Sequence, residues 1–287
     1  MSKLLPDQLK ELWQCVECKN MSTEEFGKEQ DRLLAEYRST WERALLLSGH
    51  HDLQESLLCE LGMYLGCADA AETRNRCCNA LADVKGEWHG KVDGASRESV
   101  EQFYNDSQAM IYELMWWHTL VEDTSPLAYV SALHFAGQQG CGRHLDFGSG
   151  VGSGGIIFRN SGMNVTLADI SSSMLNFSKW RFDQRKLSVH RIDLKTSALP
   201  DGAFDMVTAM DVFEHLVNPI EAVDQLWEAM EPGGFLFGRF HAEADEDRPQ
   251  HIVLDFDATL AHLHNRGFVQ IWQDEWLWGH KIFQKQS

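Results

Sequence analysis

The segment HLDFGSGVGSGG, residues 144–155, contains two overlapping glycine patterns with different chemical uses. The letters GxGxxG begin at Gly150 and match the dinucleotide-binding turn, whose first glycine directly follows a strand. The letters DxGxGxG begin earlier, at Asp146. The run RHLDF predicts a strand that ends near residue 147, because glycine weakens strands and favours turns. The earlier pattern therefore starts where the strand ends, whereas GxGxxG starts about two residues late.

Acidic residues close three predicted strands in succession. Asp146 would place a negative charge beside a pyrophosphate, but it suits a ligand with an ammonium and a sulfonium. Asp169, in NVTLADI, could accept both hydroxyls of a ribose, and Asp193, in SVHRID, could accept from an adenine amine. Open α/β sheets bind ligands at the carboxyl ends of their strands. In this order the acids favour a ligand site over a set of helix caps.

Seven short apolar runs predict the strands that position these residues. They are RHLDFGS, NVTLADI, SVHRID, FDMVTAMDV, GGFLFGRF, GFVQIWQDE and WGHKIFQKQ. Helix-like or looping segments follow the first five, which predicts an α/β fold with an open, mostly parallel sheet and helices on both faces. Only a few residues, at WLW, separate the last two runs, so we expect them to form an antiparallel hairpin.

A helical unit precedes this alternating part. Ser22 and Glu25 form a capping box ahead of apolar residues at helical spacing. The turn-rich segment 86–96 predicts a boundary, with a helical domain at 1–92 and a second domain at 93–287. Residues 97–120 predict one long amphipathic helix, and Ser125-Pro126 predicts the start of another.

Charge and composition narrow the partners. Asp and Glu number 43 against 25 Lys and Arg, a formal charge of −18, which would repel nucleic acids and anionic membranes. A neutral or cationic small molecule is the expected partner. The chain lacks a signal-peptide pattern and long apolar runs, so we expect a cytoplasmic protein. Its seven cysteines are expected to be reduced thiols, since a single CxxC does not make a zinc ribbon.

Residues from about 100 to 285 resemble the class I S-adenosylmethionine-dependent methyltransferases, in their small-molecule branch. The resemblance rests on LDFGSGVG, the acid in LADIS, and the segment ALPDGAFDMVTAMDVFEHLVNPIEAVDQLWEAMEPGGFLF. It implies a Rossmann-like doubly wound sheet, S-adenosyl-L-methionine as cofactor, and in-line methyl transfer to a small-molecule acceptor. Oxygen, nitrogen, sulfur and carbon all remain open as the acceptor atom.

By this resemblance the cofactor-binding residues lie at the ends of the first four strands. They are Asp146, Gly148, Ser149, Gly150 and Gly152 at the methionine portion; Asp169 at the ribose; Ile170, Asp193 and Leu194 at the adenine, the last through its backbone donor; and Met210 and Asp211 beside the sulfonium.

The acceptor determines which catalytic residues are needed. The main task is to align a nucleophile with the methyl group, and an acceptor that carries a proton also needs a base. The candidates are His215, His241 and His251, in the loops after the fourth and fifth strands. Glu214 and His215 could also bind a divalent ion, but two adjacent ligands are too few to specify a site, and no metal is predicted.

Aromatic residues allow a sharper hypothesis, a cage for a cationic amine, although core and interface packing is the favoured explanation. They are Tyr104, Tyr112, Trp116, Trp117, Trp272, Trp276 and Trp278.

Other functions remain open. The helical unit could be a lid, a substrate selector or the surface of a homodimer. The chain could be a non-catalytic scaffold or activator with the same fold. An NAD-dependent oxidoreductase would use the Gly150 pattern, but it leaves Asp146 and Asp193 without a role.

Overall fold

A seven-stranded sheet runs through the centre of the computed structural model, which describes residues 3–241 and 244–286. The strands are β1 (Arg143–Phe147), β2 (Asn164–Asp169), β3 (His190–Asp193), β4 (Phe204–Ala209), β5 (Met230–Arg239), β6 (Phe268–Gln273) and β7 (His280–Lys285). Their order is β3-β2-β1-β4-β5-β7-β6, and the first five are parallel. β7 is antiparallel to both β5 and β6. The predicted parallel sheet with a C-terminal hairpin is confirmed.

The register brings the carboxyl ends of the strands to one edge of the sheet. Phe147 of β1 pairs with Ala168 of β2, and Asp169 pairs with Asp193 of β3. β1 also pairs with β4, so the turn after β4 lies beside the glycine-rich turn. Residues far apart in the sequence thus meet at one edge, as expected for parallel strands.

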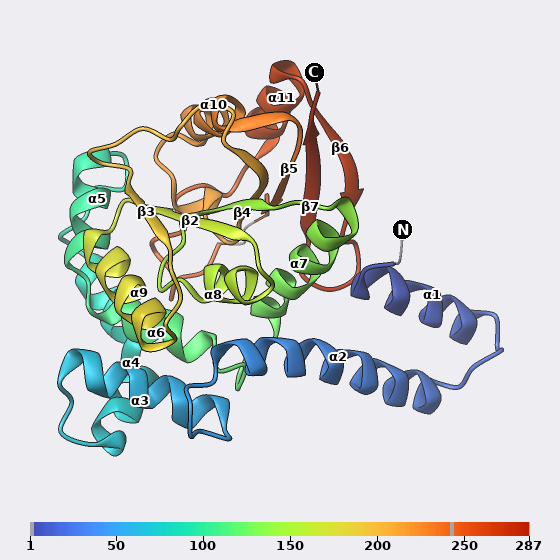
Figure 1. Cartoon of the computed structure of the whole chain (residues 1–287), viewed down its shortest axis with the longest axis horizontal. Helices are drawn as coiled ribbons and strands as arrows, with labels where there is room; N and C mark the ends of the chain where they lie inside the picture. Colours follow the sequence, from blue (N-terminus) through green and yellow to red (C-terminus); the bar gives the residue numbers. More distant parts are fainter. Residues whose placement is uncertain (1–2, 242–243, 287) are drawn as a thin grey trace.

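Helices cover both faces of the sheet (Figure 1). α7 (Ala128–Gln139), α8 (Ser153–Asn160) and α9 (Ser172–Gln184) cover one face, and α10 (Pro219–Ala229) and α11 (Asp257–Arg266) cover the other. Two hydrophobic clusters correspond to these layers. Phe158 and Phe177 belong to the first, and Val223 and Leu263 to the second.

Four helices form the N-terminal region: α1 (Leu5–Glu17), α2 (Thr23–Leu45), α3 (Leu53–Leu65) and α4 (Ala70–Trp88). The capping box at Ser22 and Glu25 is present at the start of α2. α2 runs beneath α7 and α8, where the buried Trp41 stacks on Tyr129 with 6.1 Å between ring centroids. The first hydrophobic cluster continues from these helices into α7, α8 and α9. The N-terminal helices therefore share a core with the sheet.

One predicted helix is two. Residues 97–120 contain α5 (Arg97–Asp106) and α6 (Ala109–Trp117), and Ser107 separates them. The backbone N–H of Ser107 still donates to Phe103 O at 2.9 Å, whereas its Oγ accepts from Met110 N at 3.1 Å. A serine in this role ends one helix and caps the next. Ser125 and Pro126 lie in a short 3₁₀ turn, η1 (Ser125–Leu127), that leads into α7.

Within the described ranges, no helix combines the length and the apolar character that crossing a membrane requires.

Candidate active site

A cavity of about 550 Å³ opens at the carboxyl edge of the sheet. Its walls come from the loops after β1, β2, β4 and β5 and from α5 and α6. This volume lies in the range of small-molecule sites. Eleven of the predicted residues line it: Gly148, Ser149, Gly150, Asp169, Ile170, Leu194, Met210, Asp211, His215, His241 and His251.

The turn after β1 is fixed to the acid that ends β2. Gly148 has φ +67°, and a Cβ there would lie 2.6 Å from Val212, so the turn requires glycine. Gly150 N donates to Asp169 Oδ2 at 2.8 Å, and Ser171 N donates to Oδ1 at 2.8 Å. Burial raises the pKa of Asp169, and the two N–H donors oppose this rise. Asp169 is thus held in one orientation on the cavity wall.

Asp146 lies beneath the cavity and does not line it. Its carboxylate is fully buried and accepts hydrogen bonds from Gly155 N at 3.0 Å, Thr208 Oγ1 at 2.9 Å and Tyr129 OH at 3.2 Å. Burial raises the pKa of Asp146 to about 7. Asp146 was expected beside the methionine portion of the ligand, and its contacts hold the N-terminus of α8 against β1 and β4.

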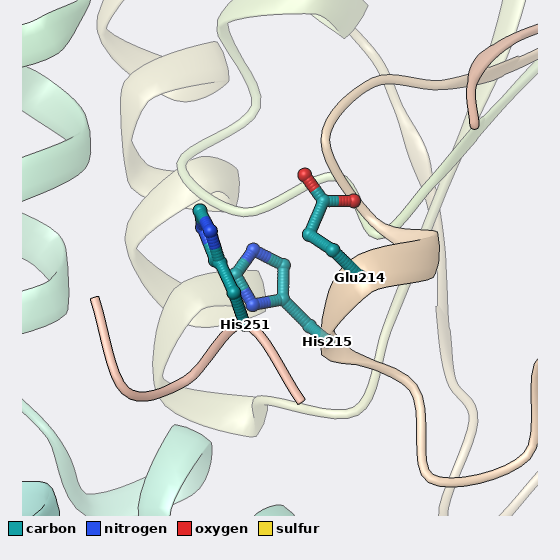
Figure 2. Close-up of side chains that lie close together, drawn as sticks. All are labelled: Glu214, His215 and His251. Atoms are coloured by element: carbon teal, nitrogen blue, oxygen red, sulfur yellow. The ribbon is translucent and has the colours of Figure 1, made fainter. Parts of the chain in front are cut away.

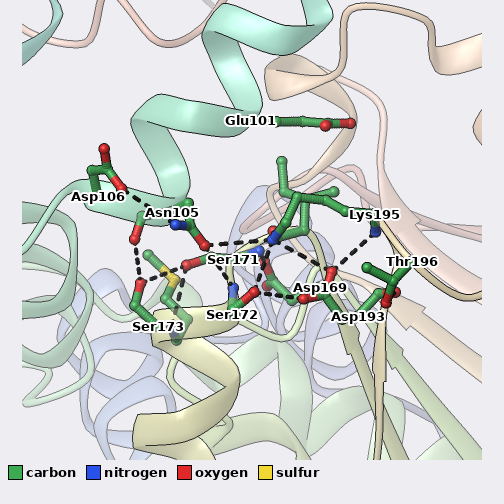
Figure 3. Close-up of polar contacts among 12 residues, drawn as sticks. Glu101, Asn105, Asp106, Asp169, Ser171, Ser172, Ser173, Asp193, Lys195 and Thr196 are labelled. Atoms are coloured by element: carbon green, nitrogen blue, oxygen red, sulfur yellow. Dashed lines mark hydrogen bonds and ion pairs between the residues drawn. The ribbon is translucent and has the colours of Figure 1, made fainter.

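Two more predicted residues lie outside the cavity lining. Gly152 is the N-cap of α8, and a Cβ there would lie 2.8 Å from Ser178. Asp193 Oδ2 accepts from Ser172 Oγ at 2.5 Å, and Lys195 lies beside it (Figure 3). These partners occupy the carboxylate that we expected to face an adenine amine.

Leu194 lines the cavity, but its backbone donor is already used. Leu194 N donates to Asp169 O at 3.0 Å, as part of the contact between the ends of β2 and β3. The adenine donor expected at this position is therefore paired within the chain.

Helix α5 is joined to the N-terminus of α9 by Asn105, which the sequence argument missed. Asn105 Oδ1 accepts from Ser172 N at 3.2 Å, and its backbone oxygen accepts from Ser173 Oγ at 2.8 Å (Figure 3). These bonds place α5 beside the residues that follow β2. Because only the fold brings α5 and the start of α9 together, the spacing of residues in the sequence did not indicate this contact.

His215 is held in one tautomer. Its Nδ1 lies 3.0 Å from Gln250 O and 2.9 Å from Tyr104 OH. A carbonyl oxygen only accepts, so Nδ1 carries the proton and Nε2 carries the free lone pair. Burial lowers the pKa of His215, which keeps the ring neutral. His215 can therefore act as a base through Nε2.

His251 and Glu214 lie next to this ring (Figure 2). The rings of His215 and His251 are 4.9 Å apart, and burial lowers the pKa of His251 to about 4. Glu214 is 1% exposed, and its Oε2 has no hydrogen-bond partner among the residues that the structure describes. The donor atoms of Glu214, His215 and His251 all lie within 4.8 Å of one another, so a metal ion could bind here. His251 supplies the third ligand that the sequence argument lacked.

Burial, followed by the charge of Asp211, raises the pKa of Glu214 to about 8. Asp211 has φ +49°, a conformation that is rare outside glycine, and its Oδ1 lies 2.6 Å from Arg239 Nη1. The strained turn holds Asp211 toward the cavity, where its charge acts on Glu214.

The aromatic cage is not formed as a unit. Tyr104 and Trp117 line the cavity, but Tyr112 OH lies 3.2 Å from Cys67 Sγ, and Trp116 Nε1 donates to Glu122 at 3.1 Å. The three hairpin tryptophans are absent from the lining. Trp276, for example, packs on Trp13 with 5.9 Å between ring centroids. Packing explains most of these rings.

Glu113, Arg239 and Arg248 line the cavity and were missed. Glu113 had a signal, because it is the one charged residue in the apolar run IYELMWW. The two arginines follow from the fold alone, since β5 and its loop reach the cavity only when the sheet is assembled.

Comparisons with known proteins agree with the topology. A family model described as a methyltransferase domain matches residues 145–236. A SAM-dependent methyltransferase from Leishmania major superposes with a TM-score of 0.51 at 16% identity, covering 70% of this chain and 88% of that chain. Residues 145–236 are therefore similar to a methyltransferase domain, and the chain shares the fold of this S-adenosylmethionine-dependent neighbour.

The chain is similar to two kinds of curated relative over part of its length. It is 32% identical to the ubiquinone biosynthesis O-methyltransferase of Dechloromonas aromatica, over 42% of the chain and 56% of the relative. It is 33% identical to the demethylmenaquinone methyltransferase of Thermus thermophilus, over 33% of the chain and 44% of the relative. The chain thus spans about half the length of the relatives that it matches.

Proposed function

We propose that the protein transfers a methyl group from S-adenosylmethionine to a small-molecule acceptor. The observation that carries the proposal is Asp169, held by Gly150 N and Ser171 N on the wall of the cavity. A carboxylate fixed in this way can accept both ribose hydroxyls, because each oxygen retains acceptor capacity. Bound S-adenosylmethionine would supply a methyl group activated by its sulfonium.

The residues present fit this cofactor. Gly148, Ser149 and Gly150 would lie along its methionine portion, because the turn that they form has no side chain at either glycine. Ile170 and Leu194 would contact the adenine. Met210 and Asp211, after β4, would border the reacting methyl group. Asp146, Gly152 and Asp193 would act by holding these turns in place, since they lie outside the cavity lining.

The acceptor is a small molecule in this proposal, neutral or cationic. A cavity of about 550 Å³ has the size of a small-molecule site, and the charge of −18 disfavours polyanions. The names of the relatives, ubiquinone biosynthesis O-methyltransferase and demethylmenaquinone methyltransferase, also point to small acceptors. We assign the base for a proton-bearing acceptor to Nε2 of His215.

Residues 1–92 and 93–287 remain our proposed division of the chain. In this proposal the first part supports the catalytic part from beneath, through α2 and α3, and it could also form a homodimer surface.

Calorimetry with S-adenosylmethionine and S-adenosylhomocysteine tests the proposal. We expect the wild type to bind both, and Asp169→Ala to bind them at least about 100-fold more weakly, because two charged hydrogen bonds contribute about 1.5–3 kcal/mol each. Asp201→Ala, at an exposed turn, is the control and should bind like the wild type. A wild type that binds neither compound contradicts the proposal, and one that binds NADH instead revives the oxidoreductase.

A further inference from the structure

The cavity contains more carboxylates than the chain neutralises. Three arginines line it, and each is already paired with acidic side chains: Arg97 with Glu101 and Glu221, Arg239 with Asp211, and Arg248 with Asp245. Asp123 and Asp169 accept hydrogen bonds from nearby donors. In the described part of the chain, Glu113 and Glu214 are the lining carboxylates for which no hydrogen bond from another residue and no ion pair is found.

These two carboxylates act on the same region of the cavity. Glu113 comes from α6 and Glu214 from the turn after β4. Burial raises the pKa of both, and the charge of Asp211 adds to this rise, whereas Arg248 opposes it at Glu113 and Arg239 opposes it at Glu214. Both charges also act on Tyr104, whose hydroxyl contacts His215. Both carboxylates line the cavity, as does Asp211, which borders the reacting methyl group in the proposed function.

The Oε2 atom of Glu214 indicates which kind of group the cavity lacks. The side chain is 1% exposed, yet this oxygen has no partner among the described residues. A buried carboxylate without a partner is costly, and it must either take up a proton or meet a cation. An acceptor with a positive charge would satisfy it.

We propose that the methyl acceptor is an amine that binds in its ammonium form between Glu113 and Glu214, beside Asp211. This inference rests on the proposed methyl transfer and narrows its acceptor to nitrogen. Glu113 and Glu214 supply the charge that binds the ammonium, and His215 supplies the base.

The reaction balances with these residues. The bound ammonium gives one proton to Nε2 of His215, which becomes an imidazolium. The freed lone pair of the nitrogen forms a bond to the methyl carbon, and the electron pair of the broken carbon–sulfur bond remains on sulfur. The product leaves as a methylated ammonium together with S-adenosylhomocysteine, and the charge is the same on both sides.

A divalent ion at Glu214, His215 and His251 is the competing occupant. Arg248 opposes it, because the positive guanidinium lies close enough to lower the pKa of both histidines. Such an ion would carry twice the charge of an ammonium against this repulsion. It would also leave Glu113, which is outside that group, without a partner.

Sinefungin is the probe, since it carries an ammonium where S-adenosylmethionine carries its transferable methyl group. We expect the full chain to bind sinefungin at least about 10-fold more tightly than S-adenosylhomocysteine in calorimetry at pH 7.5. Glu214→Gln and Glu113→Gln should each reduce this ratio severalfold, with the affinity for S-adenosylhomocysteine within about twofold of wild type. Glu228→Gln, on the exposed side of α10, is the matched control and should keep the ratio.

Each other outcome has a defined meaning. If S-adenosylhomocysteine does not bind, the proposed function fails. If it binds but sinefungin shows no preference, or both variants keep the preference, the amine inference is overturned. The amine inference is also overturned if S-adenosylmethionine is preferred over S-adenosylhomocysteine to the same extent as sinefungin, and if both variants reduce that preference equally. The carboxylates would then bind the sulfonium. Tight binding of Mn²⁺ that excludes sinefungin and is lost in His251→Ala would assign the cluster to a metal. Glu113→Gln keeps the test decisive if Glu214→Gln does not fold.

Discussion

Glu214 links the chemistry of the cavity to the stability of the protein. Its ordinary pKa is 4.5, and burial together with Asp211 raises the value in the folded state to about 8. Between these values the folded protein holds a proton that the unfolded chain has released. The free energy of unfolding therefore falls as pH rises from 4.5 to 8, and the contribution of Glu214 is constant above that.

Glu214→Gln should remove this contribution. We expect urea unfolding of the ligand-free variant to show a shallower loss of stability between pH 5 and 8 than the wild type, by up to about 1 kcal/mol per pH unit. Glu228→Gln has an exposed side chain and should keep the wild-type pH dependence. Parallel curves for wild type and Glu214→Gln would show that Glu214 stays ionised in the folded protein.

Among the individual cavity residues, the sequence predicted those that directly follow a strand. It missed those that come from segments distant in the sequence. Asp169 and Gly148 follow predicted strands directly, so their position at the ligand edge follows from local spacing. Arg239 and Arg248 could not be found in this way. For Asp146 the position at a strand end was identified correctly, but its partners Tyr129 and Thr208 could not be, because they lie in segments that only the fold brings close.

Helix α8 packs on the sheet through a glycine. A Cβ on Gly155 would lie 2.4 Å from Leu167 Cδ2, and Leu167 is fully buried. Gly155→Ala should therefore lower the free energy of unfolding by about 1–3 kcal/mol. Gly155 does not line the cavity, so the folded variant should bind S-adenosylhomocysteine within about twofold of wild type.

Gly137→Ala is the matched control for this prediction. Gly137 lies inside α7, and a Cβ there would meet no atom within 4 Å. Alanine favours helix over glycine by up to about 1 kcal/mol, so this variant should be as stable as the wild type or more stable. Loss of cofactor affinity without loss of stability in Gly155→Ala would instead show that the GxGxxG pattern contacts the ligand.

Element types were predictable from periodicity, but one boundary was not. The seven strands and the helical character of the N-terminal region were predicted. The break at Ser107 was missed because the apolar spacing of residues 97–120 continues across it. Ser107 forms hydrogen bonds that end α5 and start α6. A serine side chain that bonds to the backbone competes with continued helix, and a pattern of hydrophobic positions does not detect it.

Across the whole molecule, a buried ionic network joins the N-terminal helices to the glycine-rich turn. Arg181 of α9 is fully buried, and its Nε donates to Glu60 Oε2 of α3 at 2.7 Å. Its Nη1 donates to Val151 O at 2.7 Å and to Ser153 Oγ at 2.8 Å. Arg185 Nη1 also donates to Glu60, at 3.0 Å. Helix α3 therefore supports, through α9, a turn that lines the cavity.

Glu60→Ala would leave Arg181 buried without its counter-charge. Removing one member of a buried pair lowers stability by about 3–5 kcal/mol, so urea unfolding should shift by that amount. The affinity for S-adenosylhomocysteine should also fall, since the bond from Arg181 to Val151 loses its support. Asp183→Asn removes an exposed pair with Lys179 on the same helix and should change stability by less than about 1 kcal/mol.

The shape of the unfolding curve adds a second readout. The hydrophobic cluster that contains Trp41 continues into α8 and α9, so we expect one transition in the wild type and in Glu60→Ala. Two separate transitions, with only the first shifted by Glu60→Ala, would mean that residues 1–92 unfold independently and that the cofactor turn does not depend on them. A single shifted transition with weaker ligand binding would make the N-terminal helices part of the active-site scaffold.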